Sequence, residues 1–197
     1  KGDEDLSQIS FKNIKGNGLA VYNPNGFITD GVVNVNGKTE IVKDIPSYGY
    51  KLIKQNKENK PLFIKNKYLE NDFYIIKFNK DGSINSLFDK RNNRELVETN
   101  KSFNQLVCYE DMAYEYDNWE LAYFHKHKAY VLNEDALFNE IKEDHVVGFE
   151  IVKKYNNSVI KQTITIYDDF DRIDVKNDIV WNEKNQILFH VNGSVAG

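Results

Sequence analysis

The fold is decided by residues 146–181, which read VVGFEIVKKYNNSVIKQTITIYDDFDRIDVKNDIVW. At the end of this stretch every second side chain shares one face, and that face is mostly apolar: Ile173, Val175, Asn177, Ile179 and Trp181. The alternate positions are all charged: Arg172, Asp174, Lys176 and Asp178. A period of two predicts a β-strand with one buried face and one face in water.

Two more strands are predicted upstream, over residues 146–155 and 159–167. The dipeptide Asn156-Asn157 between them suits a tight hairpin, because asparagine tolerates a positive φ. A second reversal is predicted at residues 168–171, which read DDFD. These three strands should therefore form an antiparallel meander.

Turn signals recur along the rest of the chain, at residues 23–26, 36–37, 81–82 and 92–93. Strands between such closely spaced turns, in a chain rich in Val and Ile, predict an all-β antiparallel sandwich rather than a βαβ fold. Residues 134–141 are compatible with either a helical turn or a strand.

Residues 54–60 are polar and contain no large apolar side chain. We therefore predict a small β-sandwich domain at 10–54, a linker at 55–61 and a large β domain at 62–197. The chain opens at Lys1 instead of Met and stops at Gly197. We expect it to be a piece of a longer protein, with an incomplete large domain.

Composition excludes several classes of protein. A net charge of −4 gives no reason to expect nucleic acid as a partner. Cys108 is the single cysteine, which excludes a disulfide scaffold and suits a buried, inert thiol.

No apolar run approaches the roughly 20 residues of a membrane helix, and no signal peptide opens the chain, so we expect a cytoplasmic protein without membrane contact. The 23 Lys, 3 Arg and 25 Asn suggest an AT-rich bacterial genome.

The segment richest in chemistry is residues 109–120, which read YEDMAYEYDNWE. It carries five carboxylates and four aromatic rings. Aromatic faces stack on sugar rings and carboxylates accept hydrogen bonds from hydroxyls, so this mixture suits a carbohydrate site. The alternative is a loop at a sheet edge, with its aromatic rings in the core and its acids in water.

The pair His125 and His127 has a spacing that one face of a strand could use for a metal. Lysines flank the pair and no third ligand stands beside it, so we predict no metal site here. The chain also lacks the G-x-S-x-G, P-loop, dinucleotide-binding and H-E-x-x-H motifs.

Several phrases resemble the C-terminal β region of glycoside hydrolase family 38, the α-mannosidases. They are Leu69-Glu70-Asn71, Asp81-Gly82-Ser83-Ile84, Ser86-Leu87-Phe88-Asp89-Lys90, Arg94-Glu95, Asn104-Gln105-Leu106, Tyr109-Glu110-Asp111 and residues 117–121. Upstream, Val21-Tyr22-Asn23-Pro24 and residues 45–50 resemble phrases of the family's small β domain. Ala113 and Asn118 depart from the usual Pro and Ala, and no Phe-Pro phrase follows Val191.

The resemblance implies a galactose-mutarotase-like supersandwich that belongs to a retaining α-mannosidase. The family's nucleophile and its divalent metal, usually zinc, lie in an N-terminal barrel, so no catalytic residue, metal ligand or cofactor is expected in this chain. Its expected partners are that barrel and mannose-containing glycans, and alone it should be inactive. Tyr114, Asp117 and Trp119 are the candidate substrate-binding residues. The alternative is a free-standing carbohydrate-binding β-sandwich without catalysis.

Overall fold

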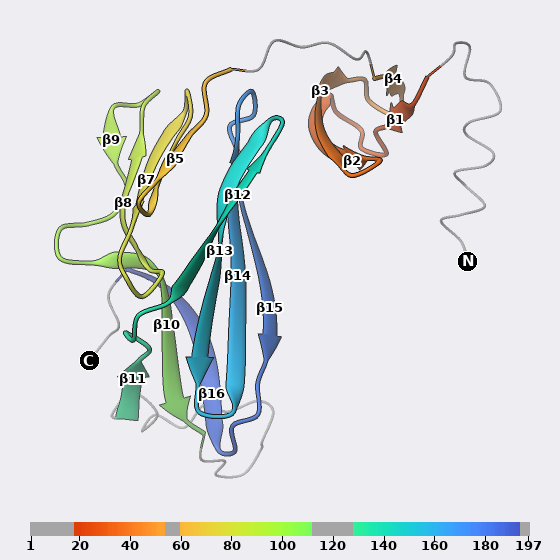
Figure 1. Ribbon diagram of the computed structural model, residues 1–197. Coiled ribbons are helices and arrows are strands. Elements are labelled where there is room, and N and C mark those ends of the chain that lie inside the picture. Colours follow the sequence, from red (N-terminus) through yellow and green to blue (C-terminus); the bar gives the residue numbers. More distant parts are fainter. Residues whose placement is uncertain (1–17, 54–59, 112–127, 194–197) are drawn as a thin grey trace. The chain divides into compact units, whose positions relative to one another are not determined.

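The computed structural model describes residues 18–53, 60–111 and 128–193, and every regular element in these ranges is a β-strand (Figure 1). This confirms the predicted all-β fold. The strands are β1 (Ala20–Tyr22), β2 (Thr29–Val35), β3 (Lys38–Ile45), β4 (Tyr50–Leu52), β5 (Phe63–Lys65), β6 (Tyr68–Glu70), β7 (Tyr74–Phe78), β8 (Ile84–Asp89), β9 (Arg94–Glu95), β10 (Ser102–Glu110), β11 (Ala129–Val131), β12 (Leu137–Glu143), β13 (Val146–Tyr155), β14 (Ser158–Tyr167), β15 (Ile173–Val180) and β16 (Gln186–Gly193). None of the described residues forms a helix that is long and apolar enough to cross a membrane.

The chain divides into two compact units between Asn59 and Lys60. The predicted domains at 10–54 and 62–197 and the linker at 55–61 are more detailed than this single division, and their boundaries stay a prediction. Each unit is described by itself below.

The small unit contains two two-stranded antiparallel sheets, β1 with β4 and β2 with β3. The predicted turn at Asn36-Gly37 joins β2 to β3, and both residues have positive φ, of 53° and 82°. This is the backbone that a tight hairpin requires, and Gly37 adopts it without steric cost. Among residues 18–53, the buried apolar side chains are those of Ile41, Val42 and Ile45.

A buried amide holds the small unit together. The Nδ2 of Asn23 donates hydrogen bonds to the backbone oxygens of Phe27, Ile45 and Pro46, at 2.7, 3.0 and 3.1 Å. Its Oδ1 accepts a bond of 2.9 Å from the N–H of Asn25. Asn23 thus ties the turn after β1 to the end of β3, and these are the two segments that resemble family phrases.

The large unit contains two antiparallel sheets. The first has the strand order β11-β10-β8-β7-β6-β5, with β16 also paired to β10 and β9 to β8. The second has the order β12-β13-β14-β15 (Figure 1). Within residues 134–141, for which the sequence left helix and strand open, a strand begins at Leu137 and forms β12.

The predicted meander is confirmed in β13, β14 and β15. Only Asn156 and Asn157 lie between β13 and β14, and Asn156 has a φ of 45°. A Cβ at Gly148 would lie 2.2 Å from the carbonyl oxygen of Ile164. The close approach of β13 to β14 therefore requires glycine at this position, which the strand pattern alone does not reveal.

The core of the large unit lies between its two sheets. Phe78 from the first sheet packs edge-to-face on Phe149 and Phe138 from the second, with ring centroids 5.6 and 6.0 Å apart. The remaining fully buried residues of this cluster include Leu69, Ile76, Ile151, Ile164 and Ile166. Burying such side chains stabilises the unit by about 1.5–3 kcal/mol each relative to leaving them exposed.

The predicted buried face of β15 is wrong for most of the strand. Ile173 is half-buried, but Val175 and Ile179 are 42% and 44% exposed. Their neighbours on β14, Ile164 and Ile160, are fully buried. The described residues of the first sheet cover β14 and leave β15 open, and sequence periodicity cannot show how far an opposing sheet extends.

Candidate functional site

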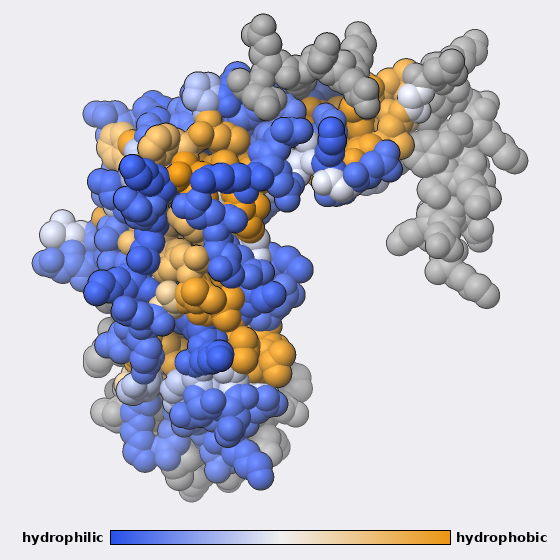
Figure 2. Space-filling view, viewed as in Figure 1, coloured by the Kyte–Doolittle hydropathy of each residue, from blue (hydrophilic) through white to orange (hydrophobic). Residues whose placement is uncertain are grey.

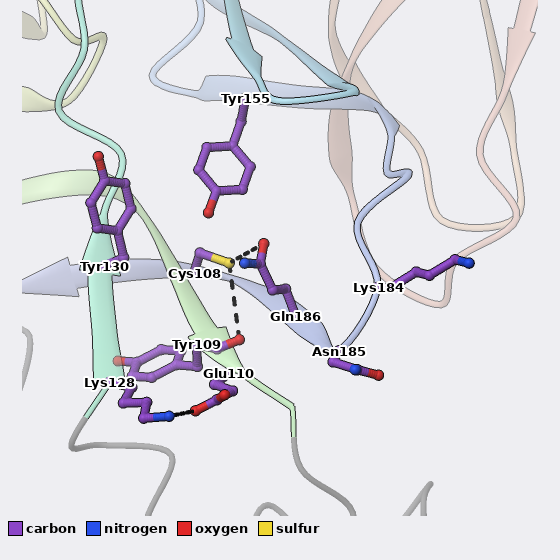
Figure 3. Close-up of a pocket in the computed structure, with 9 residues that line it drawn as sticks. All are labelled: Cys108, Tyr109, Glu110, Lys128, Tyr130, Tyr155, Lys184, Asn185 and Gln186. Carbon is purple, nitrogen blue, oxygen red and sulfur yellow. Dashed lines mark hydrogen bonds and ion pairs between the residues drawn. The ribbon is translucent and has the colours of Figure 1, made fainter.

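A pocket of about 330 Å³ lies where β10 ends and β11 and β16 begin (Figure 3). Its lining residues are Cys108, Tyr109, Glu110, Lys128, Tyr130, Tyr155, Lys184, Asn185 and Gln186. The chain leaves this pocket at Glu110 and returns to it at Lys128. The pocket therefore contains Tyr109 and Glu110, the first two residues of the aromatic and acidic segment that the sequence singles out.

The candidate residues of that segment, Tyr114, Asp117 and Trp119, lie outside the described residues, as do His125 and His127. Their predicted roles stay predictions. Tyr109 and Glu110, which open the segment, line the pocket.

Aromatic rings from four strands and one turn pack at one side of the site, and three of them line the pocket: Tyr109, Tyr130 and Tyr155. The ring of Tyr155 stacks on Trp181, with centroids 5.7 Å apart and planes within 5° of parallel. Tyr130 lies 6.1 Å from Tyr155 at an angle of 37°, and Tyr109 packs edge-to-face on Phe189 at 5.2 Å. Stacked rings of this kind form rigid apolar surfaces with polar hydroxyl tips.

The inner end of the pocket is polar but unreactive. Figure 3 shows the hydroxyl of Tyr155 directed toward the thiol of Cys108, whose Sγ lies 3.5 Å from Oε1 of Gln186. Cys108 is 2% exposed, and burial raises the pKa of its thiol. Burial also raises the pKa of the Tyr155 hydroxyl. The predicted burial of the Cys108 thiol is thus confirmed, and its inertness stays a prediction.

Charged groups occupy the rim. Lys128 forms an ion pair with Glu110, which joins the end of β10 to the residue before β11. Lys184 and Asn185 lie on the other side, in the turn before β16 (Figure 3). The rim therefore offers both donors and acceptors to a ligand that carries many hydroxyl groups.

The lining carries one carboxylate, that of Glu110. Retaining glycoside hydrolysis requires two carboxyl groups about 5 Å apart, so the described lining does not form a hydrolytic centre. Among the described residues, no group of three or more His, Cys, Asp or Glu side chains is arranged to hold a metal ion. The described residues therefore do not supply the ligands of a zinc site.

Sequence patterns did not identify Tyr130, Tyr155 or Gln186 as site residues. The antiparallel register of β10 with β16 places Gln186 opposite Glu110, 76 positions away in the chain. A pairing between such distant strands leaves no local signal. The one available hint was that Tyr155 directly precedes the Asn-Asn turn.

Comparisons with known proteins agree on one family. The family model "Glycosyl hydrolases family 38 C-terminal domain" matches residues 69–195. A relative, Alpha-mannosidase G of Dictyostelium discoideum, is 25% identical over 173 residues, which are 84% of this chain and 15% of that protein. The crystal structure of an alpha-mannosidase from Enterococcus faecalis V583 superposes with a TM-score of 0.54 at 11% identity, over 94% of this chain and 27% of that chain.

The all-β chain with its aromatic and polar pocket thus resembles a domain found in a class of enzymes that cleave sugars, the glycosyl hydrolases. The chain belongs to glycosyl hydrolase family 38 and contains its C-terminal domain. It spans about a sixth to a quarter of the length of the α-mannosidases that it matches. The structural likeness shows a common fold.

Proposed function

We propose that these residues are the C-terminal β domain of a retaining α-mannosidase that removes terminal α-mannose from glycans. The match of residues 69–195 to the family 38 C-terminal domain carries this proposal. The single carboxylate of the pocket supports the view that the nucleophile belongs to a separate catalytic barrel. We assign the divalent metal, zinc, to that barrel as well.

In this proposal the domain supports the active site by placing its pocket beside the sugar. Tyr130 and Tyr155 offer ring surfaces, while Glu110 and Gln186 offer hydrogen-bond acceptors. Tyr114, Asp117 and Trp119 are the proposed contacts within the adjoining segment. The chemistry of bond cleavage then comes from the barrel, and the β domain contributes binding and position.

The experiment measures the hydrolysis of p-nitrophenyl α-mannoside by three proteins in the presence of zinc. The 197-residue chain should release no nitrophenol above background. The same chain expressed in one reading frame after its catalytic barrel should be active, and deletion of residues 60–197 should abolish that activity. Zinc-dependent hydrolysis by the 197-residue chain alone would contradict the division of roles.

The aromatic lining favours a second candidate function, a carbohydrate-binding module without catalysis. Tyr130 is 50% exposed, so a sugar ring can reach it without rearrangement of the core. Titration of the folded chain with mannose and mannobiose should then show millimolar binding that Tyr130→Ala removes. The matched control is Phe27→Ala, which removes an aromatic ring that is 65% exposed in the small unit. Absence of binding to the folded chain at millimolar sugar would reject this candidate.

A further inference from the structure

The turn before β16, residues 181–185, closes one side of the pocket and contacts the aromatic rings on the other. Trp181 begins the turn and stacks on Tyr155 of β13. Its Nε1 donates a hydrogen bond of 3.1 Å to the backbone oxygen of Gln186, the first residue of β16. Residues 184–186 line the pocket together with Tyr155 (Figure 3). The position of this turn relative to β13 therefore sets the width of the pocket.

One carboxylate ties the turn to the tip of the β13–β14 hairpin. Oε1 of Glu183 accepts hydrogen bonds from the hydroxyl of Ser158 at 2.6 Å and from the backbone N–H of Asn157 at 3.0 Å. Its Oε2 accepts a bond of 3.3 Å from the side-chain amide of Asn156. The hydroxyl of Ser158, a residue that is 1% exposed, in turn accepts a bond of 2.8 Å from the backbone N–H of Asn182. Glu183 and Ser158 thus join two segments that lie 25 positions apart in the chain.

Neutral donors hold this carboxylate. The bond from Ser158, followed by those from Asn156 and Asn157, keeps the pKa of the Glu183 carboxyl below its ordinary value, against an opposing effect of burial. Hydrogen bonds to the charged form of an acid have this effect. The carboxylate is therefore ionised at neutral pH, and each contact uses one of its oxygens as the acceptor.

We propose that Glu183 is a positioning residue, which fixes the turn at 181–185 against the β13–β14 hairpin and thereby sets the width of the pocket for a ligand rich in hydroxyl groups. Glu183 does not line the pocket itself, so it acts through Gln186 and Tyr155. The identity of that ligand, a mannose residue, rests on the proposed function, whereas the positioning rests on the contacts above. Release of the turn should move Gln186, whose Oε1 lies 3.5 Å from the buried Sγ of Cys108, and admit solvent to the thiol.

Alkylation of Cys108 measures the position of the turn without a sugar. Cys108 is the single cysteine of the chain and is 2% exposed, so iodoacetamide should label the folded wild type slowly. A hydrophobic dye would not isolate this pocket, because hydrophobic residues already reach the surface in a band along the large unit (Figure 2). Glu183→Ala should raise the labelling rate about tenfold, since the loss of its hydrogen bonds makes local opening easier. Ser158→Ala removes only the hydroxyl and should also raise the labelling rate, so the test stands even if Glu183→Ala does not fold.

Two matched variants separate positioning from charge and from general stability. Glu183→Gln keeps an acceptor oxygen for the bonds from residues 157 and 158 but removes the negative charge, which adds to burial in raising the pKa of the Cys108 thiol. Because the contacts remain, Glu183→Gln should be labelled at the wild-type rate. Glu95 likewise accepts bonds from a serine hydroxyl and from backbone N–H groups, yet it lies on β9, which contributes no residue to the pocket lining. Glu95→Ala should lower the urea midpoint about as much as Glu183→Ala does, without faster labelling.

Calorimetric titration with mannobiose then tests which ligand the positioning serves. Mannobiose should bind the wild type and Glu95→Ala alike, and should bind Glu183→Ala about tenfold more weakly. No binding to any of these proteins, together with the expected labelling pattern, would reject mannose as the ligand and still support the positioning by Glu183. Wild-type labelling rates in folded Glu183→Ala and Ser158→Ala, equal acceleration by Glu95→Ala, fast labelling of Glu183→Gln, or unchanged sugar affinity of Glu183→Ala would overturn the proposal.

Discussion

Asn104 and Gln162 exchange two hydrogen bonds across the core of the large unit. Each side-chain amide donates to the other's oxygen at 3.0 Å, although the residues lie on β10 and β14 in different sheets. Both are buried, at 4% and 2% exposure. Asn104 also donates to the backbone oxygen of Gly82, and Gln162 donates to Asn177. A buried amide pair of this kind favours the observed alignment of the two sheets, because separating the two amides would leave buried donors and acceptors without partners.

Gln162→Leu should destabilise the large unit by about 2–3 kcal/mol. The substitution removes both bonds of the pair and leaves the buried amide of Asn104 without one donor and one acceptor. Urea unfolding followed by far-UV circular dichroism measures the change. As a control, Asn139→Leu removes an exposed amide bond to Glu150 and should change stability by less than about 0.5 kcal/mol. Equal effects of the two substitutions would show that the pair contributes nothing special.

Asn23→Asp should open the small unit while leaving the large unit folded. A carboxylate cannot donate to the backbone oxygens of Phe27, Ile45 and Pro46, so these three acceptors, of which that of Ile45 is buried, would face a negative charge. We expect at least about 2 kcal/mol of local destabilisation. Hydrogen exchange in peptides that cover residues 20–52 reports it. Asn25→Ala, in the same turn, should keep exchange slow, and fast exchange in both variants would argue against the amide's role.

Glu70 and Lys90 should make stability depend on acid pH. The hydrogen bonds from Lys90 and then from Tyr68 hold the pKa of the Glu70 carboxyl below its ordinary value, against a smaller opposing effect of burial. Because the pKa of Glu70 is lower in the folded chain than in the unfolded chain, the pair stabilises the folded chain at pH values above the ordinary pKa of glutamate. This stabilisation is lost as the pH falls through the lowered pKa of Glu70. Glu70→Gln should therefore lower the melting temperature at pH 7, and the gap to wild type should close at pH 3. A gap that stays constant between these pH values would refute the assignment.

The hydroxyl of Tyr68 should resist ionisation. Burial, together with its bond to Glu70, raises the pKa of Tyr68 to about 12. A raised pKa for an acid means that the folded state favours the neutral form, so stability is retained up to about pH 10 and declines as the pH rises toward 12. In a titration followed by absorbance at 295 nm, the change at the alkaline end should be smaller in Tyr68→Phe by the contribution of one tyrosine. Identical titration curves for the two proteins would contradict this prediction.

The sequence predicts those parts of the fold that depend on neighbours in the chain. The turns at Asn36-Gly37 and Asn156-Asn157 are examples, because their residue types determine the backbone at that point. The phrases that resemble family 38 predicted the family correctly. Some of their residues stabilise the fold through hydrogen bonds to the backbone. Asn71 accepts bonds from the N–H groups of Phe73 and Tyr74, and Lys90 bonds the backbone oxygen of Asn71.

The sequence could not predict the features that depend on contacts between strands far apart in the chain. The pocket depends on the register of β10 with β16, and the exposure of Val175 depends on the width of the opposing sheet. The sequence also does not predict the buried charge of Lys153. This side chain is 7% exposed and donates to the backbone oxygen of Leu132 at 2.6 Å. Its position on β13 resembles that of an ordinary surface lysine until the strand pairing is known.

The most direct test of the proposed function is hydrolysis of p-nitrophenyl α-mannoside, with zinc present, by the 197-residue chain and by the same chain joined to its catalytic barrel. We predict no hydrolysis by the chain alone and mannose release by the joined protein, lost again when residues 60–197 are deleted. Hydrolysis by the chain alone, or full activity of the protein without residues 60–197, would contradict the proposal that this β domain supports an active site supplied by the barrel.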